Sequence, residues 1–182
     1  DTKIGYVFQN YREAMFPWMR TIDNIAYPLK LAGKSKGDVE QRVDELVASF
    51  DVKFDLNRYP YELSGGQQQT ASIMRALAPN PEVLFLDEPF SALDFEMTLF
   101  IREKLQDVFI KTGTTMLLVS HDLEEAVYLA DQILLLTKRP TSVAEILNYR
   151  DPRPRTVETL SEPSFIAMKK RSLEIFQTEV RK

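Results

Sequence analysis

The sequence predicts an α/β fold built around a parallel β-sheet. Short β-prone apolar runs alternate with longer segments of helical periodicity, and such alternation favours right-handed crossovers between parallel strands. The run at residues 83–86 is apolar at every position, as expected for a strand that is covered on both faces. The predicted strands are residues 4–8, 83–86, 115–119 and 133–136.

Capping and breaking residues mark the helices of the first half of the chain. Ser35 is a favoured N-cap, and the apolar residues that follow it share one helical face. Those residues are Val39, Val43, Leu46, Val47 and Phe50. A second helix is predicted from Ser64 to Leu77, because Pro79 and Pro81 stop it.

The helices of the second half follow from the same signals. The next helix after the strand at residues 83–86 is predicted from an apolar stripe, and Gly113 is placed to end it. The stripe consists of Ile101, Leu105, Val108 and Phe109. Residues 123–130 form another predicted helix. Residues 164–180 are amphipathic and predict a helix in the tail.

Prolines and short apolar runs decide the remaining segments. Residues 10–28 contain Pro17 and Pro28, so they are predicted to be loop and short helix. Residues 143–147 are predicted to form an edge strand. Residues 151–155 alternate proline with arginine or aspartate and predict a stiff, extended linker.

Composition narrows the class of protein. With 182 residues, 44% hydrophobic residues and 27% charged residues, the chain suits one globular domain or one domain with an insertion. The net charge of −4 argues against a nucleic-acid binder, and the lack of cysteine excludes disulfides and thiolate metal sites. No apolar run approaches the about 18 residues that span a bilayer, so a membrane role requires a partner protein.

A glycine-rich turn predicts a phosphate site. Ser64, Gly65 and Gly66 place a hydroxyl and free backbone N–H groups at the start of a helix. Such a helix start attracts anions through its unpaired donors and its dipole, and glycine lets the backbone approach closely. Taken alone, the same residues also describe a serine N-cap followed by flexible glycines.

Two carboxylates follow the apolar strand at residues 83–86. Asp87 and Glu88 lie at the carboxyl end of a parallel strand, where open α/β sheets bind their ligands. Mg²⁺ prefers one or two carboxylates together with water and phosphate oxygens. Asp87 therefore suits a metal, and Glu88 suits an attacking water. The alternative interpretation is a solvated acidic pair in a loop.

Gln9 and His121 follow two other predicted strands. The amide of Gln9 suits a contact with Mg²⁺ or water, and the imidazole of His121 suits a hydrogen bond to a terminal phosphate. By itself Gln9 is an ordinary loop residue and His121 a structural histidine. Together with the glycine turn and the acidic pair, they favour a site for a nucleoside triphosphate.

With these motifs in order, the chain resembles the ATP-binding subunit of ABC transporters. The family's motifs match Gln9 (Q-loop), residues 63–67 (signature), residues 83–88 (Walker B), residues 91–94 (D-loop) and His121 (switch histidine). The resemblance implies a P-loop NTPase-type parallel sheet core, an inserted α-helical subdomain and a C-terminal helix. It covers nearly the whole chain.

The resemblance also assigns roles. It implies an ATPase with ATP and Mg²⁺ as cofactors, in which Glu88 and His121 are catalytic and Asp87 and Gln9 bind the metal. The nucleotide-binding residues would be Gln9, Ser64, Gly65, Gly66, Gln67 and Asp94. Two copies would hold two ATP molecules head to tail, with the signature of each copy serving the nucleotide of the other.

The family's organisation implies domain boundaries. Residues 1–9 would end the N-terminal part of the catalytic core, and residues 10–78 would form the helical subdomain with the signature. Residues 79–150 would hold Walker B, the D-loop and the switch histidine, and residues 151–182 the linker and tail helix.

Three details are similar to one importer branch, which serves nitrate, sulfonate, taurine and related solutes. They are the Phe16–Trp18 segment with residues 23–25, the turn at residues 138–140, and the tail at residues 152–155. The implied partners are a second ATP-binding subunit, membrane permease subunits and, indirectly, a solute-binding protein, but no nucleic acid. The implied location is peripheral, at the cytoplasmic face of the cell membrane.

Two departures from the family pattern keep alternatives open. No G-x-x-x-x-G-K-[ST] loop occurs, so the core is expected to be incomplete, with its Walker A part before Asp1, and the fragment is expected to be inactive alone. Thr70 stands where the family commonly has arginine. The rival interpretations are an inactive or truncated ABC ATPase fragment and a soluble ABC ATPase without a transport role.

Overall fold

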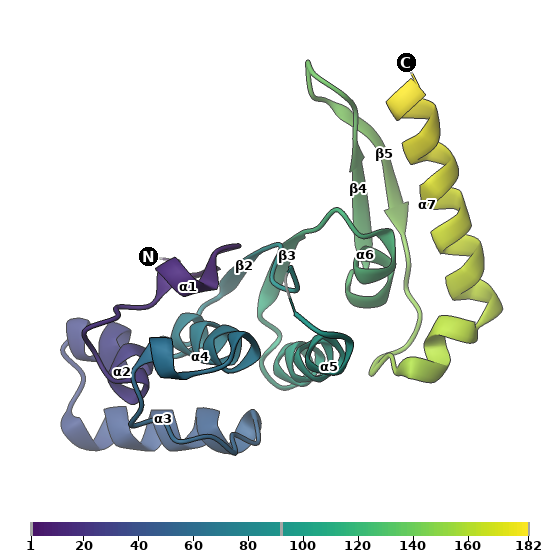
Figure 1. The fold of residues 1–182 in the computed structure, drawn as a ribbon. Coiled ribbons are helices and arrows are strands. Elements are labelled where there is room, and N and C mark those ends of the chain that lie inside the picture. Colours follow the sequence, from purple (N-terminus) through teal and green to yellow (C-terminus); the bar gives the residue numbers. More distant parts are fainter. Residues whose placement is uncertain (1, 92, 182) are drawn as a thin grey trace. The chain divides into compact units, whose positions relative to one another are not determined.

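The computed structural model describes residues 2–91 and 93–181, and for residues 180 and 181 only the backbone. The chain forms two compact units, residues 1–119 and residues 120–182. The first runs from purple to teal in Figure 1 and the second from teal to yellow. None of the helices among the described residues is both long enough and apolar enough to cross a membrane.

The first unit contains a three-stranded parallel sheet, which confirms the predicted fold class. Its order is β1-β2-β3, and its strands are β1 Ile4–Val7, β2 Val83–Asp87 and β3 Thr115–Val119. Figure 1 labels β2 and β3. Tyr6 pairs with Phe85, and Asp87 with Val119. All three strands therefore end at the same edge of the sheet.

The central strand is covered less completely than its apolar sequence predicts. Leu84 and Leu86 are buried, whereas Val83 and Phe85 are half-buried. On the same side as Phe85, neighbouring strands leave apolar side chains exposed, among them Tyr6 and Leu117. Within the described part of the first unit, only one face of the sheet is thus well covered.

The helices of the first unit agree with the predicted caps. They are α1 Tyr11–Ala14, α2 Thr21–Leu31, α3 Lys36–Ser49, the 3₁₀ turn Pro60–Glu62, α4 Gly65–Leu77 and α5 Phe95–Thr112. The Ser35 side chain accepts a hydrogen bond from the Asp38 N–H at the start of α3. Gly113 ends α5 with φ 66°, a left-handed conformation that glycine adopts without strain.

Helix α2 corrects the prediction of loop and short helix for residues 10–28. It continues through Pro28 to Leu31, although a proline inside a helix removes one backbone hydrogen bond. Its buried face, which includes Ile25 and Leu29, packs in the core against α3 and α4. Burial of this face outweighs the local cost of Pro28.

A buried amide fixes the loop before α2. The Asn24 side chain is 0% exposed, and its Nδ2 donates to the carbonyls of Phe16 (3.0 Å), Met19 (3.2 Å) and Arg20 (3.2 Å). Its Oδ1 accepts from the Phe16 N–H at 2.8 Å. This side chain therefore pairs the Phe16 N–H and the Met19 carbonyl, and it adds a second donor to the Phe16 and Arg20 carbonyls, which also accept from the Met19 and Asn24 N–H groups.

The second unit contains a hairpin and two packed helices. Its elements are α6 Leu123–Leu129, β4 Gln132–Leu136, β5 Val143–Asn148, the 3₁₀ helix Val157–Ser161 and α7 Pro163–Arg181. Its core is formed by Val127, Tyr128, Ile133, Leu135, Leu147, Tyr149 and Phe165. The predicted helix at 123–130, the strand at 143–147 and the tail helix are all present.

The hairpin corrects the prediction that residues 133–136 join the parallel sheet. Strand β4 pairs antiparallel with β5, so that Ile133 lies opposite Leu147, in a separate two-stranded sheet. Only residues 137–142 connect the two strands, and an antiparallel pair needs no more than a short turn. A parallel partner requires a crossover of about a dozen residues or more.

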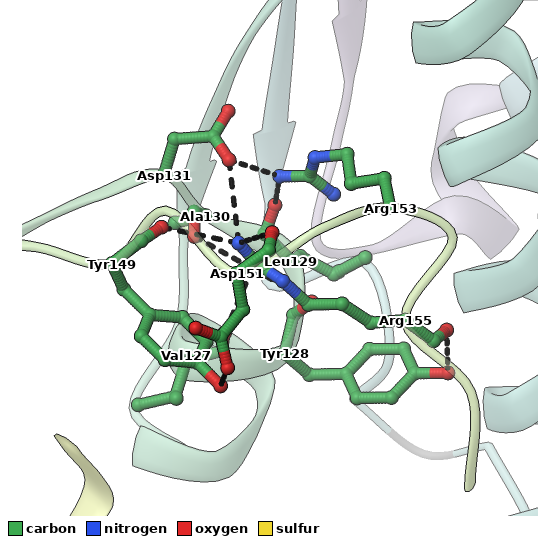
Figure 2. Close-up of polar contacts among 9 residues, drawn as sticks. All are labelled: Val127, Tyr128, Leu129, Ala130, Asp131, Tyr149, Asp151, Arg153 and Arg155. Atoms are coloured by element: carbon green, nitrogen blue, oxygen red, sulfur yellow. Dashed lines mark hydrogen bonds and ion pairs between the residues drawn. The ribbon is translucent and has the colours of Figure 1, made fainter. Parts of the chain in front are cut away.

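The segment at residues 151–155, predicted to be a stiff, extended linker, is anchored to the second unit by its arginine side chains. Figure 2 shows the guanidinium of Arg155 reaching into the end of α6. Its Nη1 donates to the carbonyls of Val127 (3.0 Å), Tyr128 (3.2 Å) and Ala130 (2.8 Å). The last carbonyls of a helix lack partners within the helix and carry partial negative charge, so a buried cation suits them.

The other half of the guanidinium ties Arg155 to the hairpin. Its Nη2 donates to the carbonyls of Tyr149 (3.1 Å) and Asp151 (3.3 Å) and to Asp131 Oδ1 (3.3 Å), which Arg153 also contacts at 2.9 Å. Burial, with the charge of Arg153, lowers the pKa of Arg155, and Asp131 opposes that shift. Arginine nevertheless remains protonated at neutral pH.

We expect Asn24→Leu to lower the free energy of unfolding of the chain by about 2–4 kcal/mol, because it removes the side-chain partners of the part-buried Phe16 N–H and Met19 carbonyl. Urea denaturation followed by circular dichroism measures the change. Gln41→Leu, which alters an exposed amide on α3, is the matched control and is expected to change little. Equal effects of the two substitutions would contradict the role of Asn24.

We expect Arg155→Met to destabilise the second unit by about 3 kcal/mol, because several carbonyls lose a charged donor together. Hydrogen exchange of the α6 and β5 amides is the measurement, and both segments should exchange faster. Arg150→Met, at an exposed arginine nearby, is the control. Unchanged protection of α6 in the Arg155 variant would show that the guanidinium does not hold this helix.

Candidate functional site

The carboxyl edge of the three-stranded sheet brings predicted site residues together. Gln9 follows β1, and Asp87 and Glu88 lie at the end of β2. The Gln9 Nε2 donates a hydrogen bond to Glu88 Oε2 at 3.2 Å, across 79 positions of sequence. The parallel pairing of β1 with β2 makes this contact, since it aligns the ends of the two strands.

Tyr6 is a site residue that the sequence alone did not indicate. Its hydroxyl donates to Asp87 Oδ2 at 3.2 Å, and its ring stacks on Phe85 with centroids 6.1 Å apart. Loss of hydration, and then the hydrogen bond and charge of Asp87, raise the pKa of Tyr6. The register that places Tyr6 beside Phe85, two positions before Asp87, is the signal that identifies it.

Glu88 has a strained backbone that its neighbours hold in place. Its φ is 43°, a left-handed value that non-glycine residues seldom adopt. Its N–H donates to the Val119 carbonyl at 2.9 Å, and its carbonyl accepts from the Ser91 N–H (3.1 Å) and Oγ (2.9 Å). Backbone strain of this kind is concentrated at functional sites.

The acidic pair fits a metal that arrives with phosphate rather than a metal held by protein alone. Among the described residues, no cluster of three or more His, Cys, Asp or Glu side chains forms a metal cage. Asp87 and the Gln9 amide nevertheless offer the hard oxygen donors that Mg²⁺ prefers when phosphate and water complete its shell. The donor set is therefore compatible with Mg²⁺ bound to a nucleotide.

The glycine turn opens α4 as predicted. Ser64 is the N-cap: its Oγ accepts from the Gln67 N–H at 3.4 Å, while Gln67 Oε1 accepts from the Ser64 N–H at 3.0 Å. This capping box uses the Gln67 side chain to stabilise the helix start. The N–H groups of Gly65 and Gly66, in the first turn, have no acceptor within the helix.

Both glycines also have a packing role within the chain. A Cβ on Gly65 would lie 2.5 Å from the Tyr11 hydroxyl, and one on Gly66 would lie 2.6 Å from Met97 Cγ. Tyr11 follows the Gln9 loop, and Met97 lies in the first turn of α5. Sequence reasoning missed both side chains, because their contacts with the turn are tertiary.

Asp94 and His121 lie at the starts of two other helices. Asp94 caps α5 by accepting from the Met97 N–H at 2.8 Å, and Ala92, part of the predicted D-loop, lies outside the described residues. His121 is exposed just before α6, whose N-cap is Asp122. Since His121 belongs to the second unit, its place beside Glu88 stays a prediction.

An aromatic cluster surrounds the Phe16–Trp18 segment of the first unit. Trp18 is 73% exposed, with its ring 5.4 Å from that of half-buried Phe16. Tyr27 packs edge-on against Phe16, and the Arg75 guanidinium lies 4.7 Å from the centre of that ring. The cluster combines an apolar surface with a cation at its border.

Comparison with known proteins decides the family. The family model for ABC transporters matches residues 1–91, half of the chain. The chain belongs to the ABC transporter family. It is 39% identical to the aliphatic sulfonates import ATP-binding protein SsuB of Bacillus subtilis over 173 residues, covering 95% of this chain and 65% of SsuB.

A second relative and a solved structure support the same family assignment. The taurine import ATP-binding protein TauB of Escherichia coli K12 is 39% identical over 176 residues, which cover 91% of this chain and 66% of TauB. The chain thus spans about two thirds of the length of these ABC relatives. The dimeric post-hydrolysis structure of the ATP-binding cassette MJ0796 with ADP and Pi has a TM-score of 0.71 and 30% identity, covering 83% of this chain and 65% of that one.

We expect Gly65→Ala to destabilise the chain, and Tyr11→Phe to relieve most of that loss. The added Cβ meets the Tyr11 hydroxyl at 2.5 Å, whereas the ring carbon that remains in Tyr11→Phe lies 3.4 Å away, an ordinary contact. A double-mutant cycle of unfolding free energies should give a coupling of about 1–2 kcal/mol. Additive effects of the two substitutions would exclude this contact.

Proposed function

We propose that the chain is the ATP-hydrolysing subunit of an ABC importer. The observation that carries the proposal is the contact of Gln9 with Glu88 next to Asp87, at the carboxyl edge of a parallel sheet. Phosphoryl transfer requires mainly positioned groups and neutralised charge. The edge assembles an amide, a metal-binding carboxylate and a candidate base from separate parts of the sequence.

Each residue has a proposed role in hydrolysis. Asp87 and Gln9 hold Mg²⁺, which when bound neutralises charge on the phosphates of ATP. Glu88 accepts the proton of the attacking water, and Gln9 fixes the orientation of the Glu88 carboxylate. His121 donates a hydrogen bond to the terminal phosphate.

A second copy of the chain completes the proposed site. Its Ser64 offers a hydroxyl, and its Gly65 and Gly66 offer the N-terminal N–H groups of α4, to the phosphates. Gln67 and Asp94 support this arrangement by stabilising the starts of α4 and α5. The MJ0796 cassette, which resembles this chain in fold, is a dimer bound to ADP and Pi. Closure of the two copies would thereby control hydrolysis.

The names of the relatives support an importer of small anionic or zwitterionic solutes. SsuB and TauB are named for import of aliphatic sulfonates and of taurine. By analogy the solute is nitrate, a sulfonate or taurine, delivered by a solute-binding protein. The chain lies at the cytoplasmic face of the cell membrane, bound to permease subunits through residues 10–78. The exposed cluster of Phe16 and Trp18 is the proposed contact.

We expect Glu88→Gln in the full-length protein to retain ATP binding and to slow hydrolysis by about 10²–10⁴-fold, because the amide cannot accept the proton. Nucleotide binding is measured by calorimetry and turnover by phosphate release. Glu82→Gln, an exposed change at the opposite end of β2, is the control and is expected to keep normal turnover. Near-normal hydrolysis by the Glu88 variant would remove Glu88 from its role.

A further inference from the structure

We propose that Gln69 is a positioning residue that connects the signature helix α4 to the backbone beside Glu88. The Gln69 side chain is 0% exposed, and its Nε2 donates to the Pro89 carbonyl at 2.6 Å. Pro89 directly follows Glu88 and is itself buried. The inference rests on the proposed function, since it concerns the residue that activates water.

Packing alone does not explain a glutamine at this position. The Gln69 Oε1 is buried and makes no hydrogen bond to any described residue. A buried amide that is satisfied on one side only lowers stability, whereas methionine of similar size would fill the same space without that cost. The polar side chain is therefore matched to the bond that it does make, which is the one to Pro89.

The bond acts on the strained turn. Glu88 has φ 43°, and Val119 and Ser91 hold its own N–H and carbonyl. The proline ring fixes φ of Pro89, so holding the Pro89 carbonyl also limits rotation of the peptide that joins Glu88 to Pro89. Gln69 thus adds a third anchor, from a helix, to a conformation that is unfavourable by itself.

This anchor links two parts of the proposed chemistry. Helix α4 begins at Gly65, where the nucleotide of the partner copy is proposed to bind, and Gln69 lies in its second turn. A helix moves as a rigid element, so a shift of its start is transmitted to the backbone at Glu88. Occupancy of one nucleotide site is thereby coupled to the geometry of the base in the other.

The test is Gln69→Met in the full-length protein. We expect kcat for ATP hydrolysis to fall about 10- to 100-fold while KM for ATP changes less than about 3-fold, because positioning and not binding is lost. The curve of hydrolysis rate against ATP concentration should also become less steep, because the two nucleotide sites lose their proposed coupling. Hydrogen exchange of residues 84–91 should accelerate, since the turn loses its helical anchor.

Thr114→Val is the matched control. Thr114 is a buried residue, 7% exposed, and its hydroxyl donates to the carbonyl of Pro81, at the other end of β2, at 3.2 Å. The Thr114→Val substitution removes a buried side-chain hydrogen bond to a proline carbonyl and leaves the turn at Glu88 unchanged. We expect it to leave kcat and exchange of residues 84–91 unchanged, and an equal loss of kcat in both variants would overturn the proposal.

Gln69→Glu provides a second test, which depends on pH, because glutamate keeps the shape of the glutamine side chain. A protonated carboxyl donates to the Pro89 carbonyl and a carboxylate does not, so kcat relative to wild type should fall as pH rises through the pKa of the new carboxyl, which burial raises. A pH-independent ratio equal to one would overturn the proposal.

The outcomes separate the inference from the proposed function. If wild type hydrolyses ATP, Glu88→Gln stops it and Gln69→Met does not slow it, the proposed function stands and the positioning role fails. If wild type hydrolyses no ATP while exchange of residues 84–91 accelerates in Gln69→Met alone, the proposed function fails and the anchoring contact stands.

Discussion

The parallel pairing of β2 with β1 and β3 is the constraint on which the candidate site depends. This pairing places Tyr6 beside Phe85 and Asp87 beside Val119, so the ends of three distant segments meet. A slip by one residue would turn Asp87 to the other face of the sheet, because side chains alternate along a strand. The buried pair Leu84 and Leu86 opposes such a slip, since it would expose both.

Buried polar side chains then fix the segments that the sheet does not reach. Asn24 binds backbone groups ahead of α2, Gln69 binds the turn after β2, and Arg155 binds the end of α6 (Figure 2). Each donates to backbone carbonyls in a loop or turn or at the end of a helix or strand. In a low-dielectric interior such bonds are strong, and an unpaired carbonyl there is unfavourable. Loop positions in both units are thus set by single side chains rather than by extended packing.

Most helices and strands could be predicted from local signals in the sequence. Features that depend on tertiary contacts could not. The caps at Ser35 and Ser64 and the left-handed Gly113 act within one helical turn, so the sequence shows them directly. The course of α2 through Pro28 depends on burial by other helices. Likewise, the contact of Tyr6 with Asp87 can be inferred only from the strand register. The contacts of Arg155 and the antiparallel pairing of β4 depend on how the second unit folds, which the local sequence does not show.

Helix α4 contacts the other segments that carry candidate site residues of the first unit. Tyr11, two residues after Gln9, packs on Gly65, and Met97, three residues after Asp94, packs on Gly66. Gln69 reaches the residue after Glu88. Three segments that carry candidate motifs therefore contact one helix within its first two turns. A glycine turn kept only for phosphate would need no such contacts, so the turn has a second task, which is to keep these segments at fixed distances from one another. The start of α4 is proposed to meet the nucleotide of a partner copy. Through these contacts the same helix start is connected to the segments that carry Gln9, Glu88 and Asp94 of its own copy.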